Sequence, residues 1–230
     1  MPAGRAGPES DPGRADVLLI AHRAPPLAAG CVALGECGVT VFELDVQAAG
    51  AEVVVSHFRP VLPVLPWLRR DRWALRWGSV GAGAERLSAA VDRLPAGTEV
   101  LLDLKDDGAR GAVLVELILR AGLDPGRCYA SSKQWSVLPP LRRAGFRTWR
   151  SVAGPRGLSR VLAAAPTGDD GVTVRHTLLD DRTIERLRRH TGQVVAWTVN
   201  DPARAARLAA TGVAGITSDN PEVFRRLGPP

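Results

Sequence analysis

Short apolar runs rich in β-branched residues alternate with amphipathic stretches of helical period over most of the chain. Nine runs predict strands, at residues 17–22, 40–46, 52–57, 99–105, 127–132, 147–152, 172–176, 194–199 and 213–218. Helical patterns lie between most of them, at residues 27–37, 84–94, 109–121, 134–144, 156–164, 181–190 and 202–210. Alternation of this kind favours a parallel sheet covered by helices.

The lengths of the connections predict which runs belong to the sheet. Only residues 47–51 separate the second run from the third, whereas a parallel crossover needs a dozen or more residues. We therefore expect the third run to fold back antiparallel, as a β-hairpin after the second strand. The other eight runs predict a closed (β/α)8 TIM barrel. An open doubly wound sheet is less favoured, because residues 22–26 form no glycine-rich phosphate loop.

Composition and length indicate one folded domain. We expect residues 1–15 to be a flexible N-terminal tail and residues 16–230 to form a single barrel domain. Hydrophobic residues make up 45% and charged residues 23%, as in an ordinary globular protein. No apolar run approaches the roughly 18 residues that cross a bilayer, so no stable membrane insertion is expected. Three cysteines without a CxxC motif indicate reduced thiols and a cytoplasmic protein.

The chain has a net charge of +6. Of its thirty basic residues, only Lys105 and Lys133 are lysines. The arginines are spread along the chain without a nucleic-acid-binding signature, so no nucleic-acid partner is predicted. Residues 58–80 are an exception, because three of the six tryptophans fall there among five arginines. This stretch is interpreted as a lid packed on the barrel, as a wall for an apolar substrate, or as a membrane-interface or nucleic-acid contact.

Charged residues interrupt the predicted strands at their carboxyl ends: His22, Arg23, Glu43, Asp45, Asp103 and Lys105, with His57 at the end of the returning hairpin arm. Residues two apart on a strand share a face, and the carboxyl ends of barrel strands meet at one rim. The carboxylates of Glu43, Asp45 and Asp103 are therefore expected to converge there. Three converging carboxylates repel one another without a cation, and hard oxygen ligands favour Mg²⁺ or Ca²⁺. The alternative is a set of ion pairs, Glu43 with Arg23 and Asp103 with Lys105.

Six motifs follow the order typical of glycerophosphodiester phosphodiesterases: IAHR at 20–23, FELDV at 42–46, VVVSH at 53–57, LLDLK at 101–105, AWTVN at 196–200 and GVAGITSDNP at 212–221. The chain resembles this family over residues 17–227. The resemblance implies a metal-dependent TIM barrel, related to spider-venom-type sphingomyelinase D enzymes. It also implies a phosphoric diester hydrolase of lipid metabolism, which converts a glycerophosphodiester to glycerol 3-phosphate and an alcohol.

The resemblance also implies roles for individual residues. His22 and His57 match the two catalytic histidines, which act as general base and general acid. The metal ligands correspond to Glu43, Asp45 and Asp103, and the bound ion would be Mg²⁺ or Ca²⁺. The substrate-binding residues correspond to Arg23 and Lys105 at the phosphate and Trp197 at the alcohol portion. A single tryptophan on a strand is also compatible with a place in the core.

Several positions depart from the family pattern. Ala24 replaces a glycine, residues 25–31 replace a Pro-Glu-Asn-Thr segment, Phe58 replaces an aspartate, Asp103 replaces a glutamate and Lys133 replaces a phenylalanine. These changes leave a second hypothesis, in which the same metal site acts on an apolar, lipid-like phosphate or diphosphate ester by cyclising transfer, elimination or ionisation. A third hypothesis is a non-catalytic barrel, against which the retained histidines and acids argue.

Overall fold

The structure is a computed structural model of the chain, and it describes residues 17–56, 60–62, 65–70, 75–76, 84–106, 111–165 and 167–228. For the strand residues between 60 and 76, the description is restricted to the backbone. The predicted tail, residues 1–15, lies outside the described residues. So do His57, one of the two predicted catalytic histidines, and Phe58.

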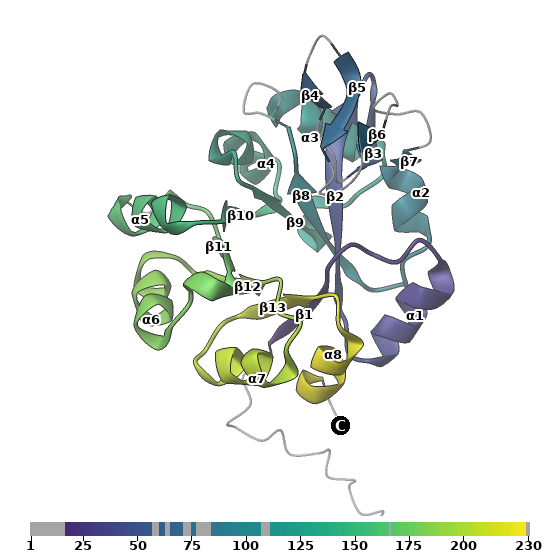
Figure 1. Cartoon of the computed structure of the whole chain (residues 1–230). Coiled ribbons are helices and arrows are strands. Elements are labelled where there is room, and N and C mark those ends of the chain that lie inside the picture. Colours follow the sequence, from purple (N-terminus) through teal and green to yellow (C-terminus); the bar gives the residue numbers. More distant parts are fainter. Residues whose placement is uncertain are drawn as a thin grey trace, which may run out of the picture.

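Eight parallel strands form a closed barrel in the described part of the chain (Figure 1). They are β1 (Leu18–Ala21), β2 (Val41–Ala49), β8 (Glu99–Leu104), β9 (Cys128–Ser132), β10 (Arg147–Val152), β11 (Gly171–Arg175), β12 (Gln193–Trp197) and β13 (Gly215–Ser218). Each strand is hydrogen-bonded to the next in this order, and β13 pairs with β1 to close the ring. The predicted TIM barrel is confirmed.

The hairpin after the second barrel strand is also present. Strand β3 (Glu52–Val55) runs antiparallel to β2, with Val46 opposite Val55, and pairs on its other side with β7 (Glu85–Arg86). Between β3 and β7 the chain forms a small antiparallel sheet of β4 (Pro60–Leu62), β5 (Leu65–Arg70) and β6 (Leu75–Arg76). The three interpretations of residues 58–80 depend on side chains outside the described residues, so they stay predictions.

Helices surround the ring of strands (Figure 1): α1 (Ala28–Glu36), α2 (Leu87–Asp92), α3 (Gly111–Arg120), α4 (Leu138–Arg143), α5 (Pro155–Ala163), α6 (Asp181–His190), α7 (Pro202–Ala210) and α8 (Pro221–Leu227). Short 3₁₀ turns occupy Pro125–Arg127, Trp135–Val137 and His176–Leu178. The sequence patterns predicted α1 to α7 but missed α8. This helix has 7 residues, and its start is marked by the cap of Asn220 on the Glu222 amide.

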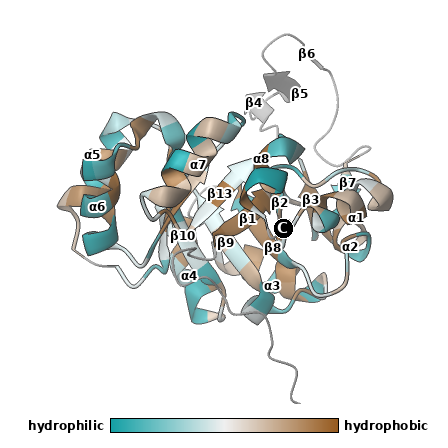
Figure 2. Cartoon of the chain, turned by 90° about the horizontal axis from the view of Figure 1, so that it is seen from below, coloured by the Kyte–Doolittle hydropathy of each residue, from teal (hydrophilic) through white to brown (hydrophobic). Residues whose placement is uncertain are grey.

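The barrel interior is filled by one inward-facing apolar side chain from each of six strands. Ile20, Val41, Leu101, Tyr129, Trp149 and Val195 form this inner cluster. The rings of Tyr129 and Trp149 stack there with centroids 4.2 Å apart. Neighbouring strand residues such as Leu44 and Leu102 face outward and pack with Leu114 of α3. Helices such as α6 therefore present hydrophobic residues inward and hydrophilic residues to solvent (Figure 2).

Gly171 at the start of β11 allows a close approach to the neighbouring strand β12. A Cβ atom at this position would lie 2.3 Å from the carbonyl oxygen of Gln193. We expect Gly171→Ala to lower the free energy of unfolding by about 1–3 kcal/mol in urea denaturation. The control Gly35→Ala lies in α1, where the nearest atom is 3.9 Å away, so this variant should be neutral or slightly stabilising. Equal losses in both variants would contradict the close approach.

Candidate active site

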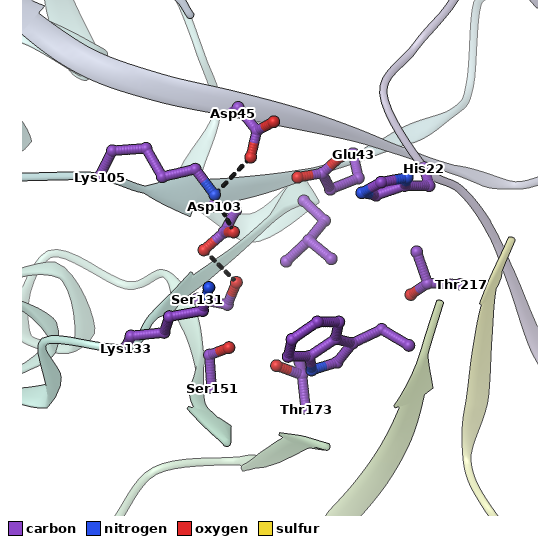
Figure 3. A pocket seen from close by; sticks show the side chains of 12 residues that line it. His22, Glu43, Asp45, Asp103, Lys105, Ser131, Lys133, Ser151, Thr173 and Thr217 are labelled. Atoms are coloured by element: carbon purple, nitrogen blue, oxygen red, sulfur yellow. Dashed lines mark hydrogen bonds and ion pairs between the residues drawn. The ribbon is translucent and has the colours of Figure 1, made fainter. Parts of the chain in front are cut away.

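A pocket of about 520 Å³, partly open to solvent, lies at the carboxyl ends of the barrel strands. It is lined by His22, Glu43, Asp45, Leu101, Asp103, Lys105, Ser131, Lys133, Ser151, Thr173, Trp197 and Thr217 (Figure 3). All eight barrel strands contribute, either directly or through a residue that follows the strand. Some polar residues of the pocket lie two positions after a residue of the inner apolar cluster on the same strand. Asp103 follows Leu101 in this way, and Ser131 follows Tyr129.

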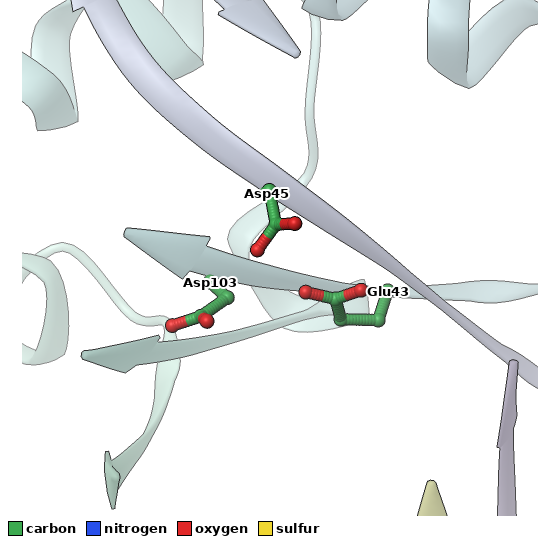
Figure 4. A group of neighbouring side chains, drawn as sticks. All are labelled: Glu43, Asp45 and Asp103. Atoms are coloured by element: carbon green, nitrogen blue, oxygen red, sulfur yellow. The ribbon is translucent and has the colours of Figure 1, made fainter. Parts of the chain in front are cut away.

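The three predicted metal ligands lie together at one side of this pocket. Asp45 on β2 and Asp103 on β8 are direct register partners, and Glu43 lies two residues before Asp45 on the same face. One carboxylate oxygen of each residue lies within 4.8 Å of the others (Figure 4). Glu43 and Asp45 are each only 4% exposed. The sequence prediction that these acids converge is therefore correct.

The acidic cluster is electrostatically unfavourable on its own. Burial raises the pKa of Glu43 well above its usual value, and the neighbouring charges of Asp45 and Asp103 raise it further. The backbone N–H of Arg23 opposes this shift by donating a hydrogen bond of 2.8 Å to Glu43 Oε2. Oxygen ligands of one Mg²⁺ or Ca²⁺ ion lie up to about 4–5 Å apart, so the spacing of these carboxylates fits a candidate metal centre.

The ion-pair alternative is partly correct. Lys105 Nζ lies 2.5 Å from Asp45 Oδ1 and also donates a hydrogen bond to Asp103 Oδ2. Burial lowers the pKa of Lys105, but Asp103 and Asp45 outweigh it and leave the pKa raised, so this ammonium is charged at neutral pH. The predicted pair of Glu43 and Arg23 takes another form, because the Arg23 side chain lies 3.4 Å from Asp45 Oδ2 and only its backbone binds Glu43.

Arg23 has an unusual backbone. Its φ of 57° lies in the left-handed region, and it is the only non-glycine residue of the described chain with this property. The conformation costs about 1–3 kcal/mol and is typical of residues that the surrounding structure holds for function. It aims the Arg23 amide at Glu43. Ala24, where the family has glycine, has no positive φ and donates its amide to the Glu43 carbonyl, so the methyl group requires no strained backbone.

His22 follows β1 and borders the pocket beside Glu43 (Figure 3). Its Nδ1 lies 2.7 Å from Asp219 Oδ1. A carboxylate only accepts, so this contact places a proton on Nδ1 and leaves Nε2 available for proton transfer. Asn200 holds Asp219 in turn, through Nδ2 to Oδ2 at 3.1 Å and through the Asp219 amide at 2.9 Å.

Asp219 and Asn200 lie in two of the quoted motifs, but neither was predicted as a site residue. The available signal was their position, since each lies within three residues after a barrel strand ends. The neighbouring Asp201 accepts a hydrogen bond from the Ala203 amide and so caps the start of α7.

Trp197 and His57 were also predicted for the site, whereas Ser131 and Ser132 were not. Trp197 is half-buried and lines the pocket, so it does not belong to the inner core. Ser131 donates a hydrogen bond of 3.2 Å to Asp103 Oδ1, whereas the Ser132 hydroxyl donates to the Leu104 carbonyl oxygen and does not line the pocket. His57 lies outside the described residues, so its predicted role is untested.

The closed parallel barrel and its acidic pocket define a TIM-barrel protein with a candidate metal centre. Residues 142–223 match the family model of the glycerophosphoryl diester phosphodiesterase family. A Bacillus subtilis (strain 168) protein named "Putative glycerophosphodiester phosphodiesterase" is 37% identical over 57 residues, which are 25% of this chain and 24% of that protein. The family resemblance predicted from the motifs is thus confirmed, although the aligned stretch spans about a quarter of the curated relative.

Solved structures show the same fold. A "Putative glycerophosphoryl diester phosphodiesterase" from Silicibacter pomeroyi DSS-3 superposes with a TM-score of 0.72 at 21% identity, over 94% of each chain. A phosphodiesterase from Oleispira antarctica, solved with its product sn-glycerol-3-phosphate, has a TM-score of 0.68 at 16% identity, over 91% of this chain and 96% of that one. At these identities the likeness establishes the fold alone. Within the described residues, no helix is long and apolar enough to span a bilayer.

Removal of the Lys105 ammonium would leave the buried Asp45 and the partly buried Asp103 without this partner. We expect Lys105→Met to lower the free energy of unfolding by about 3–5 kcal/mol at neutral pH in the presence of a chelator, measured by urea denaturation. Because the pKa of Lys105 is raised, this contribution is present at neutral pH and is lost as the pH rises through the raised value.

The matched control for Lys105→Met is Arg120→Gln, which breaks an exposed pair with Glu116 on α3. Exposed pairs contribute about 0–1 kcal/mol, so this variant should unfold almost as the wild type does. A Lys105→Met protein as stable as the control would show that the two aspartates do not depend on the ammonium.

Proposed function

We propose that this protein is a metal-dependent phosphoric diester hydrolase that converts a glycerophosphodiester to glycerol 3-phosphate and an alcohol. The observation that carries the proposal is the convergence of three carboxylates, two buried and one partly buried, with His22 in one pocket. The family match over residues 142–223 supports the substrate class. The glycerol 3-phosphate bound by the Oleispira antarctica phosphodiesterase fits the proposed product.

Glu43, Asp45 and Asp103 would hold the metal ion, either Mg²⁺ or Ca²⁺, because their oxygens are hard ligands at a suitable separation. When bound, such an ion polarises a phosphoryl oxygen and offsets charge that develops on the phosphate. Lys105 remains beside Asp45 and Asp103 and places a fixed positive charge next to the phosphate position. Arg23, whose side chain is half exposed and lies 3.4 Å from Asp45 Oδ2, is proposed as a second cationic group for the phosphate.

His22 is proposed to move a proton at its Nε2 atom. Asp219 accepts from Nδ1, which fixes the ring orientation and stabilises the imidazolium that forms when Nε2 takes a proton. His57 is proposed for the opposite proton transfer, on the strength of the VVVSH motif, so that one imidazole deprotonates the nucleophile and the other protonates the leaving alkoxide. Trp197 is proposed to contact the alcohol portion from the facing wall of the pocket.

The test is turnover of glycerophosphoglycerol, a diester with an uncharged alcohol, with Mg²⁺, with Ca²⁺ and with a chelator. We expect activity only with a divalent ion, and a fall in kcat/KM of about 10²- to 10⁴-fold in His22→Ala, because that variant loses the proton-transferring group. Glu43→Gln should weaken binding of the ion, measured by isothermal titration calorimetry, because it removes one charged ligand.

His190→Ala is the matched control, since His190 is exposed at the end of α6 and does not line the pocket. It should retain full activity. Turnover that persists in chelator, or in His22→Ala, would contradict the proposal, and turnover of only an apolar diphosphate ester would favour the repurposed enzyme.

The predicted cytoplasmic location is supported by the free thiols of Cys31, Cys37 and Cys128 and stays a prediction.

A further inference from the structure

Two protein cations lie near Trp197, which lines the pocket on β12. Lys133, directly after β9, lines the pocket together with Trp197 of β12. Lys133 Nζ lies 5.5 Å from the centroid of the Trp197 ring, and Arg175 Cζ lies at the same distance from that centroid. Two cations from separate strands therefore approach one aromatic side chain at the pocket.

Small side chains leave room for this arrangement. Strands β10 and β11 lie between β9 and β12 in the barrel, and they contribute Ser151 and Thr173 to the pocket. Both residues are short, and Lys133 lies beside Ser151 (Figure 3). The small side chains leave space for the approach of Lys133 Nζ to the Trp197 ring. Arg175 is the direct register partner of Trp197 on the adjacent strand. The barrel framework therefore determines the spacing of the two cations.

The two cations differ from Lys105 in their partners. Lys105 is bound by Asp45 and Asp103, whereas Lys133 and Arg175 are exposed and have no ion pair with a carboxylate among the described residues. Their charge therefore remains available to a ligand. An anionic group beside Trp197 would gain two attractive interactions there, and a cationic group would meet two repulsive ones.

On the proposed function, the phosphodiester itself lies at the acidic wall beside His22, so the part of the pocket around Trp197 contacts the alcohol portion of the substrate. We propose that this alcohol portion carries an anionic group, a carboxylate or a phosphate, and that Lys133 and Arg175 select it. The same two residues disfavour diesters of choline or ethanolamine. Trp197 alone would attract a quaternary ammonium through its ring face, but here two protein cations already lie near that ring.

The experiment compares four glycerophosphodiesters of similar length, with 2-aminoethyl, 2-hydroxyethyl, carboxymethyl and 2-phosphoethyl alcohol portions. The wild-type protein should show at least a tenfold higher kcat/KM for the better of the two anionic diesters than for the 2-aminoethyl diester. The carboxymethyl and 2-phosphoethyl arms distinguish the carboxylate from the phosphate. The preference should shrink as salt is added, because the contact is made in a solvent-exposed pocket.

Variants assign the preference to residues. Lys133→Met and Arg175→Met should each lower the ratio of anionic to cationic kcat/KM by about tenfold, and Lys133→Glu should reverse the preference. Arg120→Gln, which removes an exposed cation from the outer helix α3, is the matched control and should leave the ratio unchanged. A wild-type preference for the 2-aminoethyl diester, or a ratio unaltered in the two methionine variants, would overturn the proposal.

A separate binding measurement distinguishes this inference from the proposed function. If the wild-type protein hydrolyses none of the four diesters, the proposed hydrolase is wrong. Quenching of tryptophan fluorescence by the same four esters then decides the charge preference alone, with Trp197→Phe used to assign the signal. Stronger binding of an anionic ester, weakened in Lys133→Met, would support the inference, and equal binding of all four would reject it.

Discussion

The register between β2 and β8 determines the chemistry of this barrel. It sets Asp45 directly opposite Asp103, while the two-residue period of the strand places Glu43 on the same face. A shift of one residue would turn these acids outward among Leu44 and Leu102, which pack against the helices. The same alternation of inward-facing and outward-facing side chains along the strands therefore produces both the inner apolar cluster and the acidic pocket.

This arrangement concentrates charge where burial is costly. Glu43 and Asp45 are almost fully buried, and Lys105 together with the Arg23 backbone only partly compensates them. Burial and mutual repulsion raise the pKa of Glu43 for the same reason. A divalent cation would relieve this cost, which is why the acidic wall is interpreted as a metal centre. Positive charge lies elsewhere at the pocket, where Lys133 and Arg175 approach Trp197.

Much of the fold could be predicted from the sequence because the strands and helices of the barrel follow local hydrophobic patterns and are joined by connections of typical length. Alternating strand and helix patterns located the eight parallel strands, and the short connection at residues 47–51 predicted the antiparallel return of β3. Helix α8 was missed although Asn220 and Pro221 mark its start. The convergence of Glu43, Asp45 and Asp103 was predictable, since the carboxyl ends of parallel strands meet at one rim.

Other features of the site could not be predicted from local patterns. Asp219 contacts His22 across 197 residues of sequence, because β13 and β1 are neighbours only when the barrel closes. The left-handed backbone of Arg23 likewise depends on Glu43 from the next barrel strand. Lys133 was noted as a departure from the family pattern, but its approach to Trp197 depends on the small side chains of two intervening strands.

Anomalous diffraction from crystals grown with Mn²⁺, which prefers the same oxygen ligands as Mg²⁺, would locate the ion itself. The account requires one strong anomalous peak about 2–2.5 Å from carboxylate oxygens of Glu43, Asp45 and Asp103. A map without a peak between these residues, or with the ion bound elsewhere in the barrel, would contradict it.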